Sequence, residues 1–106
     1  MSWYFYVAYF FGGAFLANAI PHLVNGISGR SFPTLLASPP GKGLSPPMVN
    51  VLYGALNLAI GYLLVYHVGE FHIRRIPDAL VLGAGGLLLA VMLSRVLGHF
   101  HGEEKS

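Results

Sequence analysis

The chain has 106 residues, of which 55% are hydrophobic and 9% are charged; its formal net charge is +2 and it has no cysteine. A soluble domain of this size has a large surface for its volume and typically carries about 25% charged residues, so the composition argues against one. The lack of cysteine excludes disulfide frameworks, thiol catalysis and thiolate metal sites. The six basic residues are scattered and form no stripe that could follow a nucleic-acid backbone.

Three long apolar stretches follow one another, at residues 3–21, 48–68 and 79–99. Each has about 20 residues, enough at 1.5 Å per residue to cross ~30 Å of hydrocarbon. The first stretch has no Lys or Arg before it and is rich in bulky aromatic residues, which argues for a retained helix over a cleaved signal peptide. The sequence therefore predicts a single all-α integral membrane domain over residues 1–106, with three transmembrane helices.

Proline residues lie close to the ends of these stretches. Pro21 ends the first stretch, and Pro46 and Pro47 precede the second. Pro77 and Asp78 open the third. Proline is tolerated in the first turn of a helix, where the N–H groups have no partners within the helix, and an acidic residue there favours the positive end of the helix dipole. We therefore expect the first helix to end at Pro21 and the third to begin near Pro77.

The order of the spans predicts which segments share a membrane face. Three crossings place the N-terminus and the turn at 69–77 together, here called the turn end. The Gly- and Pro-rich loop at 23–47 and the polar tail at 100–106 share the opposite face, here called the loop end. Bare backbone is unstable in lipid, so this loop is expected at the surface or folded back over the helices.

The distribution of basic residues between the two ends predicts how the protein is oriented in the membrane. The loop end carries four of them and the turn end two, namely Arg30, Lys42, Arg95 and Lys105 against Arg74 and Arg75. The positive-inside rule then predicts that the loop and the C-terminus face the cytoplasm, for example in a bacterial cytoplasmic membrane.

Polar residues within the spans gather toward the loop end. Asn18 and His22 are four residues apart on the first helix, and Arg95 and His99 are four apart on the third, so each pair shares a helix face. Together with neighbouring loop residues they form one candidate cluster: Asn18, His22, Asn25, Arg30, Lys42, Asn50, Tyr53, Arg95 and His99.

Two interpretations of this cluster stay open. In the first, the polar side chains join the helices through hydrogen bonds worth ~0.6–2 kcal/mol each. In the second, Arg95, His22 and the loop cations form a pocket for an anion, a lipid headgroup or the carboxylate of a partner protein.

Histidine raises the question of a cofactor. His22 and His99 end helices on the same face, where two imidazoles could hold a b-type haem. His99 and His101 in the tail are weak candidates for metal binding. Histidine is also common at interfaces, so no cofactor is expected, and haem is the weakest of the functional hypotheses.

Small residues four apart recur on the first and third spans. Such pairs let helix backbones approach closely in lipid. They are Ala8 with Gly12, Gly13 with Ala17, Ala79 with Gly83, and Gly86 with Ala90. Several small faces on three helices predict a homo-oligomer, or docking to other membrane subunits.

The chain shows no spacing typical of a nucleophile with its base or of paired catalytic carboxylates, so an enzyme is disfavoured. The preferred hypothesis is an oligomeric or accessory scaffold subunit of a membrane assembly, with the lipid bilayer, copies of itself or other membrane subunits as partners. The alternative is a homo-oligomeric transporter or channel with its polar site at the Asn18, His22 and Arg95 end. Nucleic acid is not an expected partner.

Overall fold

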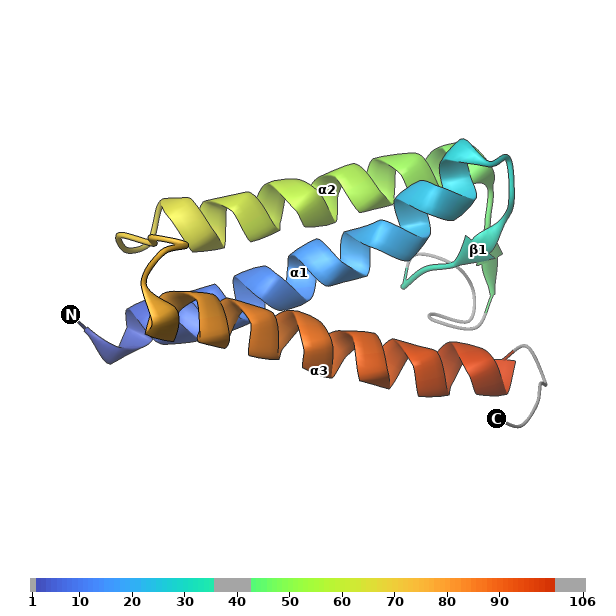
Figure 1. Ribbon diagram of the computed structural model, residues 1–106. Helices are drawn as coiled ribbons and strands as arrows, with labels where there is room; N and C mark the ends of the chain where they lie inside the picture. The colour runs from blue at the N-terminus through green and yellow to red at the C-terminus, as the bar shows by residue number, and fades with distance from the viewer. Residues whose placement is uncertain (1, 36–42, 101–106) are drawn as a thin grey trace.

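The computed structural model describes residues 2–35 and 43–100, the side chains of residues 99 and 100 excepted. In the described part, the elements follow in the order α1, β1, β2, α2 and α3 (Figure 1). Helix α1 covers Trp3–Ile27, α2 covers Pro47–Tyr66 and α3 covers Ile76–Phe100. The strands β1, at Phe32–Pro33, and β2, at Leu44–Ser45, have two residues each. The all-helical class predicted from the hydropathy pattern is confirmed.

Helix α1 is the central element. It packs against α2 on one side and against α3 on the other, so that α1 lies between its two neighbours (Figure 1). The N-terminus lies beside the turn from α2 to α3, while the C-terminal end of α3 lies at the same end as β1 and β2 (Figure 1). This is the arrangement of turn end and loop end that the order of the spans predicted.

All three helices are long and apolar enough to cross a membrane: Trp3–Ile27, Pro47–Tyr66 and Ile76–Gly98. Three such helices suggest a membrane location. The first runs further than predicted, because α1 continues through Pro21 to Ile27. The expectation that Pro21 ends this helix is wrong.

The physical reason is that one proline removes a single backbone hydrogen bond, and nearby contacts hold the following turn. Asn25 Nδ2 donates to the carbonyl oxygen of Pro21 at 2.8 Å. The helix ends where Gly29 takes a φ of 76° and its N–H donates to Gly26, a left-handed ending that glycine adopts at little cost.

A short antiparallel ladder connects α1 to α2. Phe32 is paired with Ser45 and Pro33 with Leu44, so the ends of the predicted loop at 23–47 belong to α1, β1 and β2. Residues 36–42, with the predicted site residue Lys42, lie outside the described part. Helix α2 begins with Pro47 in its first turn, as expected from its fixed φ and missing N–H.

Glycine allows α1 to approach both neighbours. A Cβ on Gly12 would lie 2.6 Å from Val65 Cγ2 of α2, and one on Gly61 would lie 3.0 Å from the carbonyl oxygen of Gly12. On the other side, a Cβ on Gly13 would overlap the carbonyl group of Leu82 in α3. Gly83, by contrast, faces open space. Gly12, Gly13 and Gly61 therefore allow close helix packing within one chain, and oligomerisation remains a prediction.

Candidate functional site

Asn50 is the centre of the polar contacts at the loop end. It lies in the first turn of α2 and its side chain is fully buried. Its Nδ2 donates to the carbonyl oxygens of Phe32 at 3.1 Å, Ser45 at 3.0 Å and Pro46 at 3.2 Å. One amide therefore ties both strands of the ladder to the start of α2.

The same side chain fixes the tautomer of His22. Asn50 Oδ1 lies 2.8 Å from His22 Nδ1. Because the Asn50 amide nitrogen faces three carbonyl oxygens, Oδ1 is the acceptor, and His22 Nδ1 must carry the hydrogen. The buried imidazole also packs edge-on against Phe32 and Tyr53, with ring centroids 5.3 and 4.7 Å away. The ring of His22 is thus held between α1, α2 and the ladder.

A second amide pair joins α1 to α2 deeper in the bundle. Asn18 Nδ2 donates to Asn57 Oδ1 at 3.0 Å, and Asn57 Nδ2 donates to the carbonyl oxygen of Tyr53 at 2.8 Å. Asn57 was not among the candidate residues, although its position seven residues after Asn50 places it on the same helix face. This spacing could have marked Asn57 as a candidate. Its partner, Asn18, could not be predicted, because it depends on how α1 and α2 are rotated against each other.

Two further contacts and the positions of two predicted site residues complete the loop end. Thr34 Oγ1 and Ser45 Oγ lie 2.7 Å apart in the buried ladder. The sequence analysis could not predict this contact, because the two residues share no helical spacing. Arg30 Nε donates to Asn25 Oδ1 at 3.0 Å on the exposed surface. Arg95 is exposed on α3, and no hydrogen bond joins it to the cluster in the described residues. The side chain of His99 lies outside the described part.

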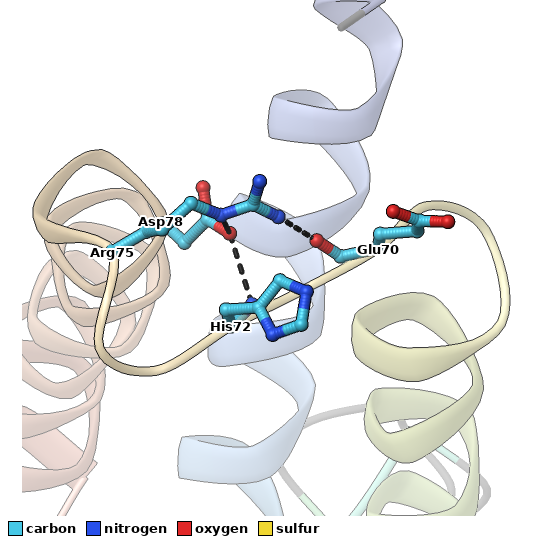
Figure 2. A network of polar contacts seen from close by, with 4 residues as sticks. All are labelled: Glu70, His72, Arg75 and Asp78. Atoms are coloured by element: carbon cyan, nitrogen blue, oxygen red, sulfur yellow. Dashed lines mark hydrogen bonds and ion pairs between the residues drawn. The ribbon is translucent and has the colours of Figure 1, made fainter.

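The turn end contains a charged network that the sequence analysis missed (Figure 2). The Asp78 side chain is fully buried, and its Oδ2 accepts hydrogen bonds from the backbone N–H of His72 at 3.0 Å and from Arg75 Nε at 3.1 Å. Arg75 also donates to the carbonyl oxygen of Glu70. The sequence indicated Asp78 as a residue suited to a helix start. In the fold, its carboxylate also accepts the hydrogen bonds that fix the turn between α2 and α3.

Two buried polar atoms close to this network have no hydrogen-bond partner in the described part, Asp78 Oδ1 and Tyr9 Oη. The Tyr9 ring packs edge-on against Phe71 at 5.1 Å, and its hydroxyl lies beside Gly69. Tyr9, Val65 and Phe71 form the buried core of the turn end. The α2–α3 turn is therefore held both by charge and by aromatic packing on α1.

Replacing Asp78 by asparagine is expected to destabilise the turn end by about 1–2 kcal/mol. The change weakens the acceptor of the His72 N–H and removes the ionic partner of Arg75, but the Arg75 side chain is 42% exposed, so water can solvate its guanidinium and limits the loss. Thermal unfolding in detergent, followed by circular dichroism, measures the effect. Glu70→Gln is the control, because the Glu70 side chain is exposed and only its backbone oxygen bonds Arg75; equal melting shifts for the two variants would contradict the assignment.

Helices α1 and α3 enclose an apolar groove at the loop end. Its volume is about 670 Å³. The lining residues are Ala17, Ile20, Pro21, Ala90, Leu93, Ser94, Leu97 and Gly98. The groove lies on the opposite side of α1 from its contact with α2, so it is separate from the polar cluster around Asn50.

The described residues contain no group of three or more His, Cys, Asp or Glu side chains that could hold a metal ion. The haem hypothesis for His22 and His99 and the metal hypothesis for His99 and His101 stay predictions, because the side chain of His99 and all of His101 lie outside the described part.

No known protein family, curated protein or solved structure matches this chain. The site must therefore be interpreted from its own chemistry. At both ends of the bundle, the buried polar side chains bond mainly to backbone groups and to each other, and this arrangement fixes helices and turns in place. Arg95, by contrast, is exposed on α3 and makes no side-chain hydrogen bond to another described residue.

Proposed function

We propose that this protein is an integral membrane protein that crosses the bilayer three times and serves as a scaffold or accessory subunit. The observation that carries this proposal is the exposure of α3. Only 6% of its most apolar stretch is buried within the protein. Large apolar side chains cover the rest of its surface: Leu80, Leu87, Leu88, Val91, Met92 and Val96. In water such a helix would form an extended apolar patch, whereas lipid tails or partner helices solvate it without cost.

The polar residues of the helices support the same proposal. Lipid provides no hydrogen-bond partners, so polar side chains within a span must find them in the protein. Asn18 bonds to Asn57, and His22 bonds to Asn50. These pairs lie between α1 and α2, so their polar groups are satisfied inside the bundle.

The scaffold role is supported by the shape of the bundle. Within the described residues, α1 is the only helix that α3 contacts extensively, so most of the circumference of α3 is open to a neighbour. Gly83 adds a smooth patch on which no atom would contact a Cβ within 4 Å. Membrane helices associate through close packing at small residues, so this open side of α3 is suited to a second copy or to a larger membrane subunit.

The test has two steps. Membranes from expressing cells are first washed with alkaline carbonate, and the protein is expected to stay in the membrane pellet; its recovery in the aqueous fraction would refute the proposal. The protein is then extracted in mild detergent, and light scattering with size-exclusion chromatography measures the protein mass of the particle. A dimer, a larger oligomer or a complex with a co-purifying subunit supports the scaffold role, and a bare monomer contradicts it.

A further inference from the structure

The apolar groove exists because α1 and α3 diverge toward the loop end. Near the turn end the two helices touch at glycines, since a Cβ on Gly85 would overlap the carbonyl group of Phe10. Toward the loop end, α1 leans toward α2 and away from α3 (Figure 1). Small residues on both walls, Ala17 on α1 with Ala90 and Gly98 on α3, leave the opening unfilled.

The dimensions of the groove suit one extended hydrocarbon chain. From Ala90 to Gly98 it follows α3 for about 12 Å, close to the ~15 Å depth of one membrane leaflet. The groove is open along one side and its lining is apolar over this length, so a hydrocarbon chain can lie in it.

Arg95 is not a lining residue of this groove, but it is a neighbour of two lining residues on α3. It follows Ser94 and precedes Gly98 by three residues, and both of these line the groove; residues three apart are neighbours on a helix surface. The Arg95 side chain is exposed, and no described residue accepts a hydrogen bond from it. It lies five residues before the last residue of α3, Phe100, so its long side chain can bring the guanidinium to the membrane–water interface.

We propose that this groove binds one acyl chain of an anionic phospholipid, whose phosphate is bound by the Arg95 guanidinium. This inference rests on the membrane location proposed above. The apolar walls accept the chain, and the guanidinium supplies paired N–H donors that match phosphate oxygens. The positive charge complements the negative charge of the lipid, and a zwitterionic lipid of equal chain length lacks that net charge.

The test measures lipid retention by native mass spectrometry of the purified, delipidated protein in neutral detergent. Phosphatidylglycerol and phosphatidylcholine with identical acyl chains are added in parallel. The wild type is expected to retain phosphatidylglycerol preferentially. Arg95→Gln is expected to reduce that retention about tenfold, the equivalent of one charge-assisted contact. Ala90→Leu, which places a larger side chain in the groove, is expected to reduce retention of both lipids.

Arg74→Gln is the matched control, because Arg74 is an exposed arginine in the turn between α2 and α3, whereas the groove lies toward the C-terminal end of α3. Retention that is equal in Arg95→Gln, Arg74→Gln and the wild type would overturn the proposal. So would competition by inorganic phosphate at the same concentration as the lipid, because the site would then bind a free anion. Loss of a dimer in Ala90→Leu without a change in lipid retention would assign the groove to a second copy and overturn it as well.

The lipid proposal can fail while the membrane proposal stands. The alkaline wash reports on membrane insertion for each variant, and circular dichroism reports on its helix content. A variant that remains membrane-bound and helical but retains lipid like the wild type contradicts only the lipid site. Recovery of the wild type in the aqueous fraction contradicts both.

Discussion

Replacing Gly85 by alanine is expected to force α3 away from α1 and to lower the free energy of unfolding by about 3 kcal/mol. A Cβ at this position would overlap the carbonyl group of Phe10. The obstacle is backbone in the middle of a helix, which cannot rotate away as a side chain can, so the whole helix contact must open. Because α1 is the only helix in the described part against which α3 packs extensively, little other helix contact can compensate for the loss. Thermal or denaturant unfolding in detergent measures the effect.

Gly83→Ala is the matched control, two residues earlier on the same helix. No atom lies within 4 Å of a Cβ built on Gly83, and alanine is favoured over glycine in a helix by about 1 kcal/mol. This variant is expected to be as stable as the wild type or slightly more so. If both alanine variants melt at the same temperature, the close approach of α1 and α3 at Gly85 is not what holds the two helices together.

Replacing Asn50 by leucine is the second substitution with a large expected effect, again about 3 kcal/mol. The change removes the Asn50 side chain from the carbonyl oxygens of Phe32 and Ser45 and from the His22 N–H, whereas the carbonyl oxygen of Pro46 keeps the backbone N–H of residue 50. Each buried polar group left unpaired costs about 1–3 kcal/mol, part of which relaxation recovers. The ladder of β1 and β2 is expected to detach from the helices, so limited proteolysis between residues 28 and 46 should accelerate along with the loss of thermal stability.

Asn25→Ala provides the comparison, because Asn25 also makes two side-chain hydrogen bonds at the loop end but lies on the partly exposed end of α1. Water can replace its contacts, so a loss of no more than about 1 kcal/mol is expected. A larger effect at Asn25 than at Asn50 would mean that the end of α1, and not the buried amide of α2, secures the connection between the helices.

These expectations divide the predicted polar cluster into two roles. Asn18, His22 and Asn50 make hydrogen bonds within the bundle, and we expect their role to be structural. Arg95 stands apart on α3 beside an apolar groove. The anion-binding interpretation therefore survives as a proposal about Arg95 and a lipid phosphate, without the participation of His22.

The sequence alone determined the all-helical class, the number of long apolar helices and the segments that share each end of the bundle. Hydropathy and helix-starting residues such as Pro47 and Asp78 act locally, so they can be recognised without knowing the fold. The candidate residues Asn18, His22 and Asn50 were also found in this way, because a polar side chain in an apolar helix is costly unless it has a partner.

The tertiary structure decided which partner each polar residue has and where the helices end. Asn57 bonds to Asn18, 39 residues earlier in the chain, only because of the rotation and crossing of α1 and α2, and α3 approaches α1 closely at glycines such as Gly13 and Gly85. The Arg75–Asp78 pair and the Asn25 bond to Pro21 join near neighbours in the chain, and the structure adds the backbone conformation that brings their atoms together. Contacts between helices join residues far apart in the chain, and no local pattern records them.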